Sequence, residues 1–265
     1  MRALIGCGAL ICAIGLGACN SDNTGPDAAT PLLDADIAQV AADATAEDVD
    51  VMREPVFFMA LAGFLPGTGD FRPANCPYDA ASGKLVCPTV TQGGVTIERS
   101  YTFWDAANAV QQAYDPVTTA RANIQSSLEG SRSGLNWEAS IGRERDMTAT
   151  GLAGTETQRT WNGTGSSHIA RSRHREDGPE RSYDLECTLT VENVVVPVPH
   201  GDDGWPLSGT ITRQCTVTFV GGRRDGQTVT RTIVVTFNGT QHVTLTVGDK
   251  VFDLDLKLRR RAARP

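Results

Sequence analysis

The chain has 265 residues, of which 40% are hydrophobic, and a formal charge of −7 at pH 7. Nine of its 31 acidic residues lie between Asn20 and Glu54, where Arg53 is the one basic residue, and the 22 acidic residues beyond Glu54 match 22 lysines and arginines. The larger part of the chain is therefore neutral, which excludes the basic footprint of a nucleic-acid-binding protein. The length allows one large domain or two small ones with an apolar core.

The chain begins with a short apolar segment of the kind that directs secretion. Arg2 precedes the apolar run Ala3–Leu16, and small residues follow it up to Cys19. A basic start, a short apolar region and small residues before a cleavage site are typical of a signal peptide, here residues 1–18. The run is too short for the roughly 20 apolar residues of a membrane-spanning helix.

The sequence Leu16-Gly17-Ala18-Cys19 resembles the lipobox of bacterial lipoproteins. This resemblance implies that Cys19 becomes the first residue of the mature protein and carries a diacylglyceryl group, so that the membrane is the first predicted partner. Asn20 stands where an aspartate commonly signals retention in the inner membrane, which favours an outer-membrane lipoprotein facing the periplasm or the surface. An ordinary signal peptide and an uncleaved membrane helix are the alternatives.

The next segments are predicted to be a tether and a helix. Residues 19–33 are small, polar and without periodicity, which indicates a flexible acidic tether. A short helix is expected from Asp34 to Arg53, ended by Pro55, because one helical stripe carries its apolar residues, Ile37, Val40, Ala41 and Ala44. The apolar segment Val56–Leu65 completes the region 34–66, and it is expected to pack on the sheet, the alternative being a segment that dips into a membrane.

Apolar and polar residues alternate with a period of 2 over most of the region 67–258. Leu185, Cys187, Leu189 and Val191 alternate with Glu186, Thr188, Thr190 and Glu192, and the same pattern recurs in later segments. This pattern predicts an all-β fold, an antiparallel β-meander in the form of a curved single-sided sheet, an open barrel or a sandwich, with the short N-terminal helix. Residues 106–114 are expected to form a turn and a strand. Residues 259–265 form a basic tail.

Four cysteines beyond the proposed anchor predict two disulfides. Folding the chain about Gly201 sets Cys187 opposite Cys215, and the midpoint of Cys76 and Cys87 also falls in a predicted turn. An even number of cysteines in an oxidising compartment favours these two pairs over other pairings. The spacings do not match a CxxC or HxxxH metal site, and no cofactor motif is present.

The C-terminal hairpins can be placed in register from the sequence. A three-residue loop at Asn238-Gly239 would set Ile233 opposite Val243, and a two-residue turn at Gly248-Asp249 would set Leu245 opposite Phe252. Two Asn-Gly-Thr triplets, at 162–164 and 238–240, are both interpreted as hairpin turns.

The densest candidate for chemistry is the arginine-rich segment 168–175. Strand alternation would put Arg171, Arg173 and Arg175 on one face and His168 and His174 on the other. Such a face could contact phosphate or lipid headgroups, and the alternative is a solvated face paired with nearby glutamates. The general abundance of arginine over lysine is interpreted as a compositional bias.

The sequence predicts no catalytic residue, since neither a nucleophile elbow nor a phosphate-binding loop is present. The first hypothesis is therefore a non-enzymatic envelope lipoprotein that binds another envelope component or has a structural role. The second is a carrier of a hydrophobic ligand or lipid on the apolar face of the sheet, which requires an open cavity on that face. A glycan-active or hydrolytic enzyme is the third.

Overall fold

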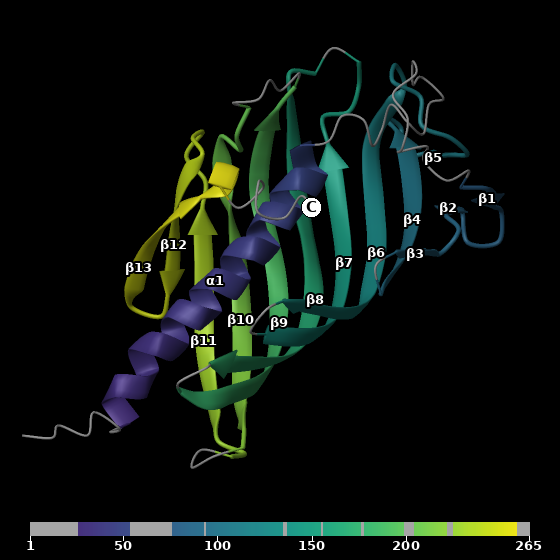
Figure 1. Cartoon of the computed structure of the whole chain (residues 1–265). Helices are drawn as coiled ribbons and strands as arrows, with labels where there is room; N and C mark the ends of the chain where they lie inside the picture. Colours follow the sequence, from purple (N-terminus) through teal and green to yellow (C-terminus); the bar gives the residue numbers. More distant parts are fainter. Residues whose placement is uncertain are drawn as a thin grey trace, which may run out of the picture.

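A computed structural model describes residues 26–53, 76–92, 94–134, 137–154, 156–175, 178–198, 204–221 and 225–258. These residues form one helix and one antiparallel sheet of 13 strands (Figure 1). Cys19, the apolar segment 56–65 and the basic tail 259–265 lie outside the described residues, so the predictions made for them stay predictions.

The sheet is a meander in which strands that follow one another in sequence also pair. Its order is β1-β2-β4-β6-β7-β8-β9-β10-β11-β12-β13, with β3 and β5 paired to β4. The strands are β1 Tyr78–Asp79, β2 Lys84–Val86, β3 Val90–Gln92, β4 Val95–Asp105, β5 Val110–Gln111, β6 Thr119–Gly134, β7 Trp137–Thr150, β8 Gln158–Arg175, β9 Gly178–Pro197, β10 Ser208–Val220, β11 Thr228–Thr236, β12 His242–Val247 and β13 Lys250–Asp255.

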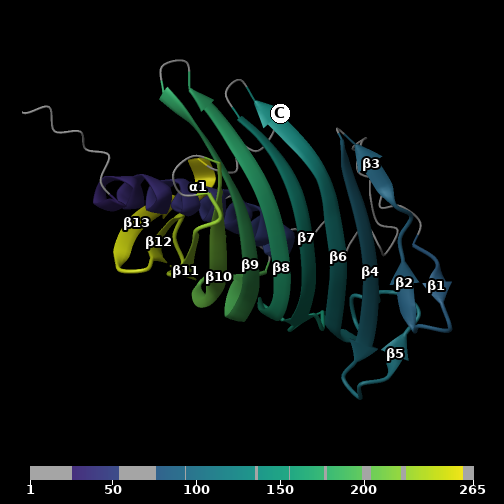
Figure 2. The ribbon, with the colours of Figure 1, turned by 90° about the horizontal axis from the view of Figure 1, so that it is seen from below.

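The sheet is open and strongly curved (Figure 2), with β1 and β13 at its two edges. The all-β prediction is therefore confirmed, and of the three forms considered the curved single-sided sheet is the observed one. The predicted turn and strand in residues 106–114 are also confirmed. Asn108 donates its backbone N–H to the Asp105 carbonyl, and β5 pairs with β4.

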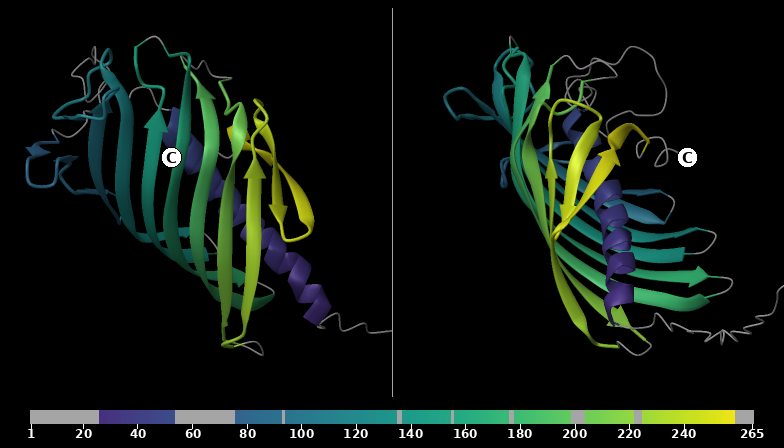
Figure 3. Two further views of the ribbon diagram at one scale, coloured as in Figure 1. Left: turned by 180° about the vertical axis from the view of Figure 1, so that it is seen from behind. Right: turned by 90° about the vertical axis from the view of Figure 1, so that its left-hand side faces the viewer.

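Helix α1, Pro26–Arg53, crosses the concave side of the sheet (Figure 3). It has 28 residues and begins eight residues before the predicted start at Asp34, so the prediction of a tether through residue 33 is wrong from Pro26 onward. Proline is well tolerated at the first position of a helix, and Asp27 near a helix N-terminus is favoured by the helix dipole. Among the described residues, no helix is long and apolar enough to cross a membrane.

The two faces of the sheet differ in chemistry, as the alternation predicted. One face, called here the apolar face, carries the core side chains and meets α1; its fully buried members include Phe103, Trp161, Leu185, Ile211, Ile233 and Leu245. The opposite face, called here the polar face, carries serine, threonine, asparagine and acidic side chains. Burial of the apolar face supplies the main driving force for the fold.

The registers of the disulfide-bearing and C-terminal strands test the sequence predictions. Cys187 lies opposite Cys215, and the pairs Cys187–Cys215 and Cys76–Cys87 are both disulfide-bonded, as predicted. Leu245 lies opposite Phe252, also as predicted. Two disulfides indicate a compartment outside the cytoplasm.

The register predicted for β11 and β12 is wrong. Ile233 lies opposite Val247, not Val243, so the connection between the strands is longer than three residues. Asn238 holds this longer connection, since its side chain accepts the Thr240 N–H at 3.0 Å and donates to the His242 carbonyl at 3.0 Å. Phe237 is buried at the end of β11 and takes no part in a tight turn.

The first Asn-Gly-Thr triplet is not a hairpin turn. Asn162 and Gly163 lie inside β8, where the register with β9 shifts, and Asn193 on β9 has a φ of 50°. The Asn162 side chain accepts the backbone N–H of Asn193 at 2.9 Å. The triplet therefore forms a β-bulge that bends a long strand, although its residue types would also suit a turn.

The acidic residues of α1 form ion pairs with bases on the apolar face. Asp48 accepts from Arg145 Nε at 2.9 Å and from Arg213 Nη2 at 2.7 Å, and all three side chains are buried. Arg213 Nη1 also donates to Thr45 Oγ1 at 2.8 Å. Glu47 pairs with Arg143. These three arginines therefore have a structural role.

A second ion-paired group lies one third of the way along the same helix. Asp34 accepts from Arg231 Nε at 2.8 Å and from Lys250 Nζ at 2.5 Å. Burial alone would raise the pKa of Asp34, but hydrogen bonds and attraction from the two cations outweigh burial and lower the pKa. The pKa of Asp48 is lowered for the same reason by Arg145, Arg213 and Arg143, whereas burial lowers the pKa of Arg213 to about 10.

Gly165 makes room for one of these arginines. It lies opposite Arg145, and a Cβ at residue 165 would stand 2.5 Å from the Glu144 carbonyl oxygen and 2.9 Å from Arg145 Cδ. Gly142, on the neighbouring strand β7, offers a contrast, because a Cβ there would meet only the His168 carbonyl at 4.0 Å.

We expect Gly165→Ala to lower the free energy of unfolding by about 1–3 kcal/mol, because backbone and Arg145 must move to admit the methyl group. The matched variant Gly142→Ala should be neutral or stabilise by about 0.4–1 kcal/mol, since an unstrained Gly-to-Ala change reduces the entropy of the unfolded chain. Urea unfolding followed by circular dichroism measures both. Equal effects of the two variants would contradict the role assigned to Gly165.

We expect Asp48→Asn to cost about 3–5 kcal/mol, because it leaves two buried arginines without their shared counter-ion. Glu192→Gln, at an exposed position of β9, should stay within about 0.5 kcal/mol of the wild type. Because the native pKa of Asp48 is lowered, its stabilisation is present above the unfolded-state pKa of about 3.9 and is lost as the pH falls through the native value. The stability of Asp48→Asn should therefore fall less than that of the wild type on acidification, and parallel pH curves would contradict the ion pairing.

Candidate functional site

Among the described residues, large side chains are packed on the apolar face, where a hydrophobic carrier would need an open cavity. Trp161, Phe103 and Ile211 are fully buried on this face, and α1 lies across it. Three hollows of the described chain are lined mainly by hydroxyl, amide and charged side chains. The candidate binding surface is therefore the polar face.

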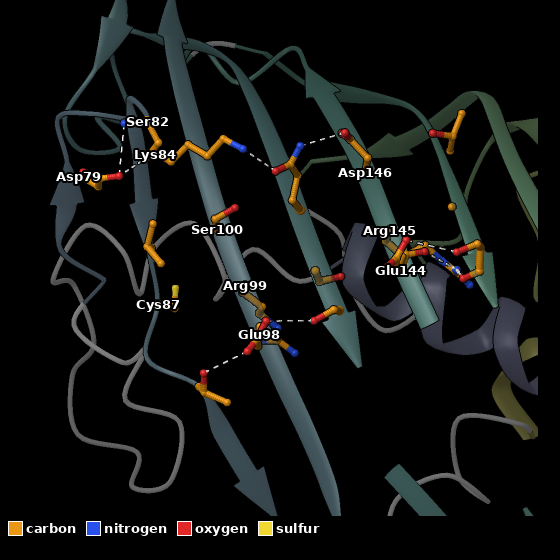
Figure 4. A pocket seen from close by; sticks show the side chains of 18 residues that line it. Asp79, Ser82, Lys84, Cys87, Glu98, Arg99, Ser100, Glu144, Arg145 and Asp146 are labelled. Carbon is orange, nitrogen blue, oxygen red and sulfur yellow. Dashed lines mark hydrogen bonds between the residues drawn. The ribbon is translucent and has the colours of Figure 1, made fainter. Parts of the chain in front are cut away.

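One hollow is a trough that runs across β2, β4, β6, β7 and β8 (Figure 4). Its volume is about 880 Å³, within the range of about 300–1,000 Å³ typical of ligand sites. Long neighbouring strands hold its floor, and the β1–β2 hairpin, fastened by the Cys76–Cys87 disulfide, forms one wall. We call this hollow the polar trough.

The floor of the polar trough consists of two rows of facing side chains. Because antiparallel strands set alternate residues side by side, each row crosses four strands at a spacing of about 4.8 Å. The first row is Glu98, Ser127, Glu144 and Ser166, and the second is Ser100, Gln125, Asp146 and Thr164. The alternation of the strands alone thus aligns eight hydrogen-bonding side chains on one surface.

The second row is held in place by a chain of hydrogen bonds. Lys84 Nζ donates to Gln125 Oε1 at 2.6 Å, and Gln125 Nε2 donates to Asp146 Oδ2 at 3.0 Å. Asn123 Nδ2 donates to the other carboxylate oxygen of Asp146 at 2.5 Å and to Thr148 Oγ1 at 3.2 Å. Asp146 is therefore an exposed carboxylate whose position is fixed by two amides, and Figure 4 shows the hydrogen bond from Gln125.

The first row is tied more loosely. Glu98 accepts from Thr89 Oγ1 at 3.4 Å and from Ser127 Oγ at 3.5 Å, and Glu144 accepts from Ser166 Oγ at 3.4 Å. Asp79, on the wall, accepts from the Ser82 hydroxyl and from the backbone N–H groups of Ala81 and Ser82, which lowers its pKa. The lining carries the carboxylates of Asp79, Glu98, Glu144 and Asp146 and the ammonium group of Lys84, whereas Arg145 belongs to the apolar face, so the trough is acidic.

Trp104 lies on the polar face of β4, four residues after Ser100. The guanidinium of Arg121 stacks on its ring, with 4.2 Å between Arg121 Cζ and the ring centroid. Trp104 is half-buried. An aromatic side chain therefore follows the polar trough along β4.

A second hollow continues the polar face toward β11. Its volume is about 580 Å³, and it shares Ser127, Glu144 and Ser166 with the polar trough. Its further lining includes His168, Glu186, Thr188, Gln214, Thr216 and Thr230. The polar trough therefore opens at one side onto a longer polar surface.

The predicted arginine face is described only at Arg171. Arg171 shares the apolar-face positions of β8 with Ile169 and is half-buried, whereas His168 is exposed on the polar face. The side chains of Arg173 and Arg175 lie outside the described part of the chain, so the common face of the three arginines stays a prediction. Within the described residues, no group of three His, Cys, Asp or Glu side chains could hold a metal ion.

Comparison with known proteins gives no further assignment, because neither a family model, nor a curated protein, nor a solved structure matches the chain. The function must therefore be argued from the residues of the chain.

Sequence reasoning missed the polar trough and the buried arginines. The trough depends on registers that join residues from five strands, and these are not visible in any one segment. The buried arginines could have been predicted from strand alternation. Arg213 and Arg231 occupy alternate positions of their strands that otherwise carry buried apolar residues. A basic residue at such a position predicts a buried acidic partner.

Proposed function

We propose that the protein is a lipid-anchored envelope protein that binds a neutral, hydroxyl-rich envelope component, a glycan chain, along the polar trough, without catalysis. The observation that carries this proposal is the pair of facing rows, in which fixed carboxylates, amides and hydroxyls offer both donors and acceptors. A sugar presents the complementary array of hydroxyls around a ring.

The shape and charge of the polar trough support a chain-like ligand. The rows repeat at the strand spacing of about 4.8 Å, close to the length of one sugar unit, and the second hollow extends the surface beyond the trough. The carboxylates of the lining disfavour a polyanion, and they can accept hydrogen bonds from the hydroxyl groups of a neutral ligand. Trp104 provides an aromatic ring on the same face, on which a sugar ring could stack.

The anchor is supported by sequence features and by the disulfides. The lipobox-like sequence ending at Cys19 supports covalent lipid attachment, and the disulfides Cys76–Cys87 and Cys187–Cys215 fit an exported protein. Two or three acyl chains hold a protein stably on a membrane, whereas a single chain gives marginal binding of about 10⁴ M⁻¹. We place the protein in the outer membrane, on the basis of Asn20.

We expect Cys19→Ala to move the protein from the membrane fraction to the soluble fraction of lysed cells, because it removes the thiol that would carry the lipid. Fractionation followed by immunoblotting measures this, and Cys12→Ala serves as the control. Continued detergent-sensitive attachment of Cys19→Ala would refute the anchor.

We expect Asp146→Ala to weaken glycan binding about ten-fold or more, since losing a hydrogen bond to a charged group costs about 1.5–3 kcal/mol and 1.4 kcal/mol is ten-fold. Soluble oligomers of N-acetylglucosamine in calorimetry, and co-sedimentation with purified cell-wall sacculi, measure binding. Asp253→Ala is the matched control, because Asp253 is an exposed carboxylate on β13, far from the trough. Unchanged binding by folded Asp146→Ala would refute the site, and release of shorter sugars by the wild type would replace binding with hydrolysis.

A further inference from the structure

The first row of the polar trough continues beyond the trough along the polar face. Ser166, its last residue within the trough, lies opposite Thr188 on β9. Thr188 lies opposite Gln214 on β10, which in turn lies opposite Thr232 on β11. From Glu98 on β4 to Thr232, the row therefore crosses seven neighbouring strands. Six spacings of about 4.8 Å give it a length of about 29 Å.

A third row runs beside the first, two residues away along each strand. Its members are Glu129, Gly142, His168, Glu186, Thr216 and Thr230. All six line the second hollow, and so do the first-row residues from Ser127 to Gln214. The polar trough lies on the other side of the first row, between the first row and the second. The two hollows therefore flank the first row on opposite sides.

The two hollows meet over β6, β7 and β8. They share three first-row residues, Ser127, Glu144 and Ser166. A ligand that fills both hollows therefore crosses the first row here, with Glu144 on the central strand of the crossing (Figure 4). Its path runs across the strands from β4 to β11. At one sugar unit for each strand spacing of about 4.8 Å, the path holds about six units.

The second hollow offers the same hydrogen-bonding chemistry as the polar trough. Thr188, Gln214 and Thr230 are exposed, and each carries a hydroxyl or an amide group. Glu186 adds an exposed carboxylate. Hydroxyl and amide groups both donate and accept hydrogen bonds, and a carboxylate accepts them, so the lining suits the hydroxyl groups of further sugar units.

Gly142 gives the second hollow its depth. It lies on β7 between Glu129 and His168 in the third row. A Cβ at residue 142 would stand 4.0 Å from the His168 carbonyl oxygen, so a side chain there would project into open space within the hollow. This space can receive a substituent of a sugar ring, such as an acetamido group.

We propose that the second hollow continues the glycan site and that one linear glycan chain of about six units lies across the strands, from the polar trough over Glu144 to β11. This inference rests on the proposed function and adds to it the direction, the length and the far end of the site. The site selects long linear glycans over short ones, since only a chain of this length reaches Gln214 and Thr230 from the trough.

Oligomers of N-acetylglucosamine with two to eight units provide the test, in calorimetry with the purified protein. We expect the affinity of the wild type to rise at least about ten-fold from the dimer to the hexamer and then to level off, because each unit up to the sixth meets a further strand. Gly142→Leu should abolish this gain and leave the affinity for the dimer unchanged, because leucine fills the second hollow. Gly142→Ala, which adds only a methyl group, should keep most of the gain.

A second variant removes a contact at the far end without filling the hollow. Gln214→Ala should weaken binding of the hexamer about three- to ten-fold, the effect of one lost hydrogen bond, and leave binding of the dimer unchanged. The matched control is Gln227→Ala, because Gln227 is exposed just before β11 and lines neither hollow. Circular dichroism confirms that each variant is folded.

The outcomes separate this inference from the proposed function. Equal affinity of the wild type for the dimer and the hexamer would overturn the inference, and so would a gain with length that is unchanged in Gly142→Leu or in Gln214→Ala. In each of these cases, dimer binding that depends on Asp146 would leave the proposed function standing. Failure of the wild type to bind any oligomer would overturn the proposed function and the inference together.

Discussion

The fold depends on neutralising the cations that stand on the apolar face. A sheet with one apolar side must cover it, and here the cover is a helix that meets Arg143, Arg145, Arg213, Arg231 and Lys250 as well as apolar side chains. Without the carboxylates of Asp34, Glu47 and Asp48, these cations would lose water and gain nothing in return. The helix can therefore take one position along the sheet, in which each acid meets its base.

This pairing explains an unusual feature of the helix. Much of its buried surface is alanine, which contributes little apolar area per residue, and an alanine-rich surface could slide along the sheet without much change in contact. Ion pairs depend strongly on the distance between the two charges, so they fix the position of α1 along the sheet. Buried ion pairs are known more for such specificity than for net stability.

The sequence predicted the parts of the fold that depend on local alternation. The strand parity of Cys187 and Cys215 was enough to place their disulfide, and the turn at Gly248-Asp249 was enough to place Leu245 opposite Phe252. The errors arose where individual side-chain hydrogen bonds, and not the alternation of apolar and polar residues, determine the turn or the register. Asn238 lengthens one connection through its own hydrogen bonds, and Asn162 bends a strand that its sequence would allow to turn.

The polar trough could not be predicted because its geometry comes from pairing between distant segments. Gln125 and Asp146 are unremarkable polar residues in their own strands, and they become neighbours only when β6 and β7 adopt their observed register. The single-sided pattern did predict that one face would be polar. What it lacked was the order of side chains across the strands.

The separation of the ion-pair partners along the chain has a consequence for how the protein is made. Asp34 precedes its partner Lys250 by 216 positions, and Asp48 precedes Arg213 by 165. Because synthesis begins at the N-terminus, the helix is made first and these counter-ions are made last. The helix therefore cannot complete its ion pairs on the apolar face until the last strands have been made. A chain truncated before these strands would leave Asp34 and Asp48 without these partners.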